Sequence, residues 1–297
     1  MKRSLLERLF WSPNFFTIAI RHRRKADAPI WERLQFQTEY TMPATPDCWA
    51  ADPMLAEENG KTYLFYEAVH HGKGRIEVVQ IRENGSVSNP QVALERDYHL
   101  SYPFVFRYEG SWYMIPESCA IDEVQLFKAE RFPEKWVYVT TLLRGHAADT
   151  TVQSMNGKLL LLTFLPQSGS ECVTPEAYWL TIENETAELQ QIPWPKYDTL
   201  TVRGAGRFLN SNGTMIRPVQ VSREHSYGDA VAFFSAQLQA DAYQEKHISA
   251  LLPEHISGCK YRVDGLHTYA LGNDFEVIDV RCQLPDPTKI LRKLIGK

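Results

Sequence analysis

Short apolar runs separated by polar turns recur along this chain in a fixed arrangement. In the first copy, an apolar run after Asp52 leads through a turn at Gly60 into a second apolar run that ends at Glu67. Three further copies keep these offsets and a fifth is weaker and shorter. Their equivalent glycines lie 50, 47, 56 and 59 residues apart, at Gly60, Gly110, Gly157, Gly213 and Gly272. Short strands repeated with a period near fifty predict an all-β fold, a five-bladed β-propeller of four-stranded antiparallel blades.

The two ends of the repeated region predict how the ring closes. The fifth copy lacks outer strands, whereas a strand-like run at residues 15–20 has no partner of its own. Pairing between them would leave no open seam. No segment between about residues 35 and 285 shows helical periodicity, and the repeat disfavours a β-sandwich, the main alternative. We therefore expect one propeller domain over residues 15–284, flanked by segments 1–14 and 285–297.

Both flanking segments have the pattern of short basic amphipathic helices. Each places four apolar residues on one helical face beside Lys and Arg: Leu5, Leu6, Leu9 and Phe10 in the first, Ile290, Leu291, Leu294 and Ile295 in the second. Such helices can lie in the interface of an anionic membrane. The alternative is that both dock onto the propeller or onto a neighbouring subunit.

Composition narrows the class of protein. The formal net charge is −4, so bulk nucleic-acid binding is not expected. The five cysteines are scattered without Cys-x-x-Cys spacing, which predicts neither a disulfide framework nor a zinc site. No apolar run is long enough to span a membrane, and the N-terminus lacks a secretion signal. We expect a cytoplasmic protein without metal or cofactor, peripheral at the inner face of the membrane if its ends bind lipid.

Candidate chemistry is expected where the innermost strands meet. Two sets of equivalent positions fall there, one at the strand starts and one where each hairpin returns. The first set is Asp52, Tyr102, Asp149, Ala205 and roughly His267; the second is Glu67, Glu117, Phe164 and Gln220. The turn glycine is kept in every copy, whereas these positions vary in charge. Such variation indicates contact with a ligand, so we expect Tyr102, Glu67 and Gln220 to contact substrate.

The carboxylates of these sets are the candidate catalytic residues. Asp52 and Asp149 could share a substrate at the mouth of the ring, although Asp52 before a proline also fits an Asx-type turn. Glu67 and Glu117 end apolar runs and, if ionised, need partners. Each is either functional or paired with an arginine of the blade core. His267 is either a proton shuttle or phosphate contact, or a satisfied core histidine.

The fourth copy is basic. Arg203, Arg207 and Arg217 are suited to bidentate recognition of phosphate or carboxylate, and Tyr227 lies nearby in the sequence. A Gly-x-Gly occurs between the first two arginines, but no predicted helix follows it, so it is not a dinucleotide-binding fingerprint.

Several motifs resemble one propeller family, that of the N-terminal domain of plant glucosamine inositolphosphorylceramide transferase and its bacterial relatives. They are residues 49–53, 101–105, 113–117, 217–220 and 266–268. The resemblance covers about residues 15–282 and implies carbohydrate chemistry in a surface-glycan or glycolipid pathway.

The blades are more distantly similar to those of arabinanase- and xylosidase-type propeller glycosidases. That similarity implies that Asp52 matches their general base, while Tyr102 or Phe104 stands where they have a second Asp. Arg203 stands in the region of their acid Glu, and an arginine cannot act as the acid. The usual carboxylate pair is therefore incomplete unless Glu117 or Asp149 supplies the acid.

These observations favour a glycosyltransferase that uses a phosphate-activated sugar in bacterial surface-polysaccharide or glycolipid biosynthesis. Its partners would be a sugar phosphate or nucleotide-sugar donor, held by the arginines, and a glycan or glycolipid acceptor, deprotonated by Asp52. Two alternatives remain: a propeller-type glycoside hydrolase, and a non-catalytic glycan-binding or scaffold module.

Overall fold

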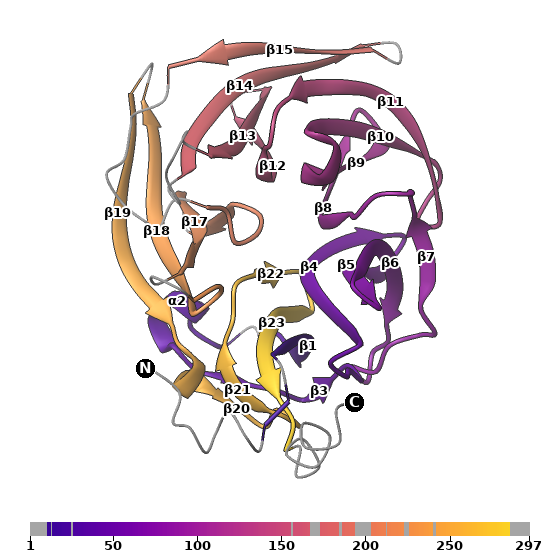
Figure 1. Ribbon diagram of the computed structural model, residues 1–297. Coiled ribbons are helices and arrows are strands. Elements are labelled where there is room, and N and C mark those ends of the chain that lie inside the picture. Colours follow the sequence, from indigo (N-terminus) through magenta and orange to yellow (C-terminus); the bar gives the residue numbers. More distant parts are fainter. Residues whose placement is uncertain are drawn as a thin grey trace.

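Five antiparallel sheets stand around a common axis in the computed structural model of the chain (Figure 1). The structure describes residues 11–12, 14–24, 26–155, 157–166, 173–183, 186–193, 203–211, 213–222, 226–239 and 242–285. The prediction of a five-bladed propeller is confirmed. The predicted terminal helices fall almost wholly on residues 1–10 and 286–297, outside the described residues.

Four blades are built from consecutive strands, in the order inner to outer. The first contains β4 (Cys48–Glu58), β5 (Lys61–His70), β6 (Lys73–Ile81) and β7 (Gln91–Leu94). The second contains β8 (Ser101–Tyr108), β9 (Ser111–Glu117), β10 (Glu123–Arg131) and β11 (Lys135–Arg144). The third contains β12 (Ala148–Met155), β13 (Lys158–Pro166), β14 (Val173–Glu183) and β15 (Thr186–Ile192). The fourth contains β16 (Leu209–Ser211), β17 (Thr214–Val221), β18 (Ala230–Gln239) and β19 (Ala242–Leu251).

The fifth blade joins the two ends of the chain. Its strands β21 (Arg262–Gly265) and β22 (Tyr269–Leu271) both pair with β23 (Phe275–Gln283). The other edge of β23 pairs with β1 (Phe15–His22), and β1 pairs in turn with β3 (Tyr40–Thr41). The ladder between β1 and β23 is unbroken from Phe15↔Cys282 to His22↔Phe275. The predicted closure by the N-terminal strand is thus confirmed, and β3 adds a further outer strand from the same end.

Short elements complete the structure. The helix α2 (Ile30–Arg33) lies between β1 and β2 (Phe36–Gln37), and β2 pairs in parallel with β20 (Ile256–Ser257). Two single-turn 3₁₀ helices are η1 (Cys119–Ile121) and η2 (Pro253–His255). Among the described residues, no helix has the length and apolar character that a bilayer span requires.

The inner strands of three blades carry a bulge at the same position of the repeat. The strand registers shift at Asp52, Tyr102 and Asp149, and these three residues have positive φ angles of 53°, 40° and 49°. A non-glycine residue in this conformation costs about 1–3 kcal/mol, so surrounding contacts must hold it. A bulge redirects side chains next to functional sites.

The carboxylate of Asp52 bonds to other blades. The alternative of a local Asx-type turn at Asp52, in which the carboxylate would bond to its own strand, is therefore wrong.

Ring closure by β1 should be necessary for stability. Ile18 is fully buried in β1, whereas Ile248 of β19 is 40% exposed. Because truncation of a buried isoleucine costs about 2–5 kcal/mol, Ile18→Ala should lower the urea midpoint strongly. The matched variant Ile248→Ala should leave it almost unchanged, and equal midpoints for the two variants would contradict this account of closure.

Candidate active site

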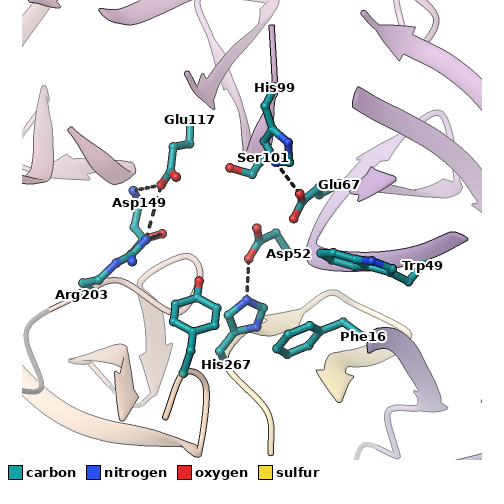
Figure 2. Close-up of a pocket in the computed structure, with 11 residues that line it drawn as sticks. Phe16, Trp49, Asp52, Glu67, His99, Ser101, Glu117, Asp149, Arg203 and His267 are labelled. Carbon is teal, nitrogen blue, oxygen red and sulfur yellow. Dashed lines mark hydrogen bonds and ion pairs between the residues drawn. The ribbon is translucent and has the colours of Figure 1, made fainter. Parts of the chain in front are cut away.

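A cavity of about 250 Å³ opens at the starts of the inner strands, where residues from all five blades meet (Figure 2). Four acids, two histidines and one arginine line it together with Ser101 and three aromatic residues. The charged members are Asp52, Glu67, Glu117, Asp149, His99, His267 and Arg203. The repeat thus correctly predicts that acids of both equivalent sets gather at one mouth.

Three carboxylates in this region, the buried Asp52 and Asp279 and the half-buried Glu117, bond to the backbone of the next blade. Asp279 of β23 accepts from the N–H of Asp52 at 3.0 Å, and Asp52 accepts from the N–H of Tyr102 at 3.2 Å. Glu117 accepts from the N–H of Asp149 at 3.0 Å. The donors are the three bulged residues, so each carboxylate holds a strained backbone in place while it joins two blades. We refer to these contacts as the interblade carboxylate bonds.

Asp52 and His267, which line the cavity, form a buried cluster with Asp279 behind them. His267 Nδ1 lies 2.5 Å from Asp279 Oδ2, and His267 Nε2 lies 3.6 Å from Asp52 Oδ1. Burial raises the pKa of Asp52 to about 8 against the attraction of His267. Burial opposes the charge on His267, but Asp279 and Asp52 outweigh it and raise its pKa to about 9. These shifts favour the protonated form of Asp52 and the imidazolium form of His267.

The ligand atoms of these three side chains lie within 4.8 Å of one another, close enough to share a metal ion. Their oxygens are already used. Asp279 Oδ1 accepts from the N–H groups of His267 and Thr268 at 3.0 and 2.8 Å, and Asp52 Oδ1 accepts from the Thr268 hydroxyl at 3.0 Å. An ion would have to displace fixed donors, so the geometry fits an ion pair better than a metal centre.

Arg203 occupies the opposite side of the cavity. It makes a bidentate pair with Asp149, at 2.6 and 3.1 Å, and lies 3.5 Å from Glu117. Burial, followed by the charge of Asp149, raises the pKa of Glu117. Arg203 is therefore committed to protein carboxylates and is poorly placed to clamp a phosphate. The alternative reading of Glu117, a pair with an arginine, is confirmed in part, although this arginine lines the cavity.

Glu67 has a histidine partner. His99 Nε2 lies 2.8 Å from Glu67 Oε1, and the side chain of His99 is 42% exposed. The hydrogen bond to Glu67 raises the pKa of His99. This pair connects the first blade to the segment that enters the second, and it faces the cavity (Figure 2).

Aromatic rings line the remaining side. Phe16 of β1 stacks on His267 with 4.5 Å between ring centroids, and Trp49 lies 5.9 Å from Phe16. Tyr227 meets His267 edge to face at 5.1 Å. Figure 2 shows Phe16 and Trp49 across the cavity from Glu117 and Asp149. The cavity thus has an aromatic side and an acidic side.

Several predicted substrate contacts are placed elsewhere. Arg217 is buried in the fourth blade, where it forms a bidentate pair with Glu245. Arg207 lines a different cavity and donates to the carbonyl of Val105. The expected arginine clamp is therefore wrong as a group, because in the propeller Arg207 and Arg217 project away from the mouth at which Arg203 lies.

Tyr102 and Gln220 lie beneath the cavity and do not line it. The Tyr102 hydroxyl accepts from the N–H of Gly206 at 3.0 Å and lies 3.2 Å from the Thr151 hydroxyl. Gln220 is 2% exposed and donates to the carbonyl of Gly204 at 3.2 Å. A Cβ on Gly206, whose φ is +126°, would lie 2.3 Å from the carbonyl oxygen of Tyr269. The Gly-x-Gly thus allows close backbone packing at the centre of the ring.

The sequence did not predict a role for five residues of this region, which are Phe16, Trp49, His99, Ser101 and Asp279. A signal for Asp279 was present, because it follows Gly272 by seven residues, the same offset that relates Gly60 to Glu67. Trp49 and Ser101 lie inside two of the motifs that resemble the family, at residues 49–53 and 101–105, but no role was predicted for either. Phe16 and His99 lie outside the repeated positions, and only the closed ring brings them to the cavity.

Comparisons with known proteins agree with this architecture. Residues 18–272 match the family described as glucosamine inositolphosphorylceramide transferase 1, N-terminal. Glucosamine inositolphosphorylceramide transferase 1 of Oryza sativa subsp. japonica is 28% identical over 221 residues, which are 72% of this chain and 30% of the relative. The chain therefore spans less than a third of the length of that curated relative. The predicted family resemblance is confirmed.

Solved structures show the same fold at low sequence identity. β-1,2-Mannobiose phosphorylase from Listeria innocua has a TM-score of 0.57 at 10% identity, covering 86% of this chain and 95% of its own. The α-L-arabinanase of Cellvibrio cellulosa has a TM-score of 0.51 at 13% identity, covering 75% and 85%. The predicted similarity to propeller glycosidases is confirmed for the fold.

The raised pKa values predict how stability depends on pH. The folded protein holds protons on Asp52 up to about pH 8 and on His267 up to about pH 9, above their ordinary values of 3.8 and 6.5. Both contributions are therefore present at low pH and are lost as pH rises through these folded values. Between pH 6.5 and 8.5, the unfolding free energy should fall by up to about 1.4 kcal/mol per pH unit for each proton.

Asp52→Asn removes one of the two protons and should make this pH dependence shallower, as measured by urea unfolding at pH 6.5, 7.5 and 8.5. The control is Asp122→Asn, which alters the exposed pair of Asp122 with His146 and should keep the wild-type slope. Parallel curves for Asp52→Asn and wild type would show that Asp52 is already ionised at neutral pH.

Proposed function

This chain belongs to the family of the N-terminal domain of glucosamine inositolphosphorylceramide transferase 1, and we propose that it is a carbohydrate-active protein. The observation that carries the proposal is the two-sided cavity: aromatic rings face carboxylates across a space of about 250 Å³. Aromatic faces pack against the apolar C–H face of a sugar, whereas carboxylates accept hydrogen bonds from its hydroxyl groups. A sugar ring matches both sides of this cavity.

Within this site, Asp52 is proposed as the proton donor. Burial raises its pKa to about 8, so it holds a proton at neutral pH and can transfer it to an oxygen of a bound sugar. This assignment reverses the role of general base that the glycosidase similarity implies. Asp149 is occupied by Arg203. The carboxylates left to accept a proton from an attacking hydroxyl group or water are Glu67 and Glu117.

Glycosyl transfer is the finer activity that we propose. It rests on the name of the relatives, which joins a sugar, glucosamine, to a phosphorylated lipid, inositolphosphorylceramide, and it agrees with a glycan or glycolipid acceptor. Since Arg203 is paired and Arg217 is remote, this cavity offers little for a diphosphate. We therefore place the sugar ring here, and do not assign a phosphate of the donor to it.

A second candidate, glycoside hydrolysis, is favoured by a specific observation. Four carboxyl groups line one cavity, and a pair of carboxyl groups, one of which holds a proton, is the requirement of glycosidase chemistry. The two activities differ in the acceptor of the sugar: transfer uses a hydroxyl group of a second substrate, whereas hydrolysis uses water. Release of free sugar without an added acceptor would favour hydrolysis over transfer.

Sugar binding should depend on the aromatic side. In thermal-shift measurements with neutral oligosaccharides and nucleotide sugars, the ligand that raises the melting temperature of the wild type should fail to do so with Trp49→Ala. The control is Trp179→Ala, because Trp179 lies in the third blade against Lys158. It lines neither this cavity nor the separate cavity that Arg207 lines. Equal stabilisation of both variants would place the sugar elsewhere.

Turnover should depend on the proton of Asp52. Asp52→Asn keeps the size of the side chain but removes the acid, so we expect kcat to fall by roughly 100-fold or more for the sugar that stabilises the wild type. Binding of that sugar should change little, as measured by calorimetry. A variant that retains wild-type kcat would exclude Asp52 as the proton donor.

A further inference from the structure

A second cavity, of about 470 Å³, lies at the other end of the inner strands. Where the innermost segment of a blade contributes to both cavities, its residues that line the second cavity follow those that line the first along the chain. Asp52 precedes Glu57, Ser101 precedes Arg107, and His267 precedes Leu271. Because the inner strands of a propeller all run in the same direction along its axis, the two cavities open at opposite faces of the ring.

Packed residues separate the two cavities. The buried Tyr102 side chain crosses the centre of the ring and bonds to Gly206 of the fourth blade, beside Thr151 of the third. A ligand in the second cavity therefore cannot reach Asp52 while Tyr102 holds this position. The second cavity requires its own explanation, independent of the function proposed for the first.

The charge of the second cavity is opposite in character to that of the first. Its lining includes three arginines, Arg23, Arg107 and Arg207, and one acid, Glu57. Both oxygens of Glu57 are held by Asn273, whose backbone N–H donates to one at 2.5 Å and whose side-chain amide donates to the other. The three arginines therefore outnumber the two carboxylates beside them, Glu57 in the lining and Glu58 next to Arg107.

Arg207 is the central cation of this group. Its guanidinium donates to the carbonyl of Val105 and lies 5.2 Å from the ring centroid of Phe104. Within the part of the chain that the structure describes, no carboxylate lies within 4.0 Å of it, whereas Arg203 and Arg217 both have such partners. A guanidinium has five N–H donors, so most of those of Arg207 remain available to a ligand.

The other two arginines lie at the rim. Arg107 pairs with Glu58 at 2.9 Å and lies 6.0 Å above the ring of Trp112, with its side chain 52% exposed. Arg23 is exposed and donates to the carbonyl of Gly272 at 3.2 Å. Two adaptable cations at the entrance and one half-buried cation behind them suit an anion with several oxygens.

We propose that this second cavity binds the phosphate group of a small soluble ligand, such as a sugar phosphate. Phosphate offers several oxygens and up to two negative charges, which three guanidinium groups can share through bidentate hydrogen bonds. The cavity is larger than the first and has room for a group attached to the phosphate.

Titration calorimetry with glucose 1-phosphate and pyrophosphate, and with glucose as the uncharged control, tests the proposal. Both phosphates should bind the wild type and glucose should not bind at this cavity. Arg207→Gln should weaken the phosphates by about tenfold or more, since a charge-assisted hydrogen bond contributes about 1.5–3 kcal/mol. Arg23→Gln, at an exposed position that does not endanger folding, should weaken them in the same direction.

Two controls locate the site. Arg131→Gln removes a cation that is 71% exposed and paired with Glu134, and should leave phosphate affinity unchanged. Trp49→Ala alters only the first cavity and should also leave it unchanged. Absence of phosphate binding to the wild type, equal affinity in Arg23→Gln and Arg131→Gln, or loss of phosphate binding in Trp49→Ala would each overturn the proposal.

Discussion

Carboxylates that accept the backbone N–H of the next blade are the constraint on which this structure depends. Asp279, Asp52 and Glu117 each make such a bond, and the donors are the bulged residues Asp52, Tyr102 and Asp149. A residue with positive φ is strained, and a buried carboxylate is costly without donors. The bulged residue supplies the N–H donor that the carboxylate needs, and the carboxylate holds the bulged backbone in place. The bonds therefore stabilise both the bulges and the junctions between blades.

The same constraint produces the properties of the candidate active site. The bulges turn side chains toward the axis, and the bonds bring Asp52, Asp149 and Glu117 to one mouth. Crowding and burial then raise the pKa of Asp52 and Glu117. A protonated acid near ionised carboxylates is a useful catalytic arrangement. In this protein it arises from residues that also hold the ring together, so their substitution is expected to affect stability as well as activity.

Much of the fold followed from the sequence because its signal is periodic. The glycine spacing predicted the blades, and the unpartnered run at residues 15–20 predicted ring closure. The site was harder to predict because it depends on which direction each side chain takes. Arg203, Arg207 and Arg217 lie close together in sequence, yet one faces the first cavity, one the second and one the blade interior. No local pattern distinguishes these directions, since the fourth blade has an irregular inner strand that begins only at Leu209.

Phe16 and His99 show a second limit. Each reaches the cavity from a segment outside the repeat, and each has its partner far away in sequence, His267 for Phe16 and Glu67 for His99. Asp279 is a different case, because its offset from Gly272 matched the repeat and the shortness of the fifth copy concealed it. The repeat therefore predicts the acidic half of the cavity better than its aromatic half.

The central claim is that burial among neighbouring carboxylates, at the junction between blades, leaves Asp52 protonated at neutral pH. The most direct test is an NMR titration of the carboxyl carbon of Asp52, assigned by comparison with Asp52→Asn. The account predicts a midpoint near pH 8, followed by titration of the His267 ring near pH 9. A midpoint near the ordinary value of 3.8 would contradict it and would return Asp52 to the role of a base.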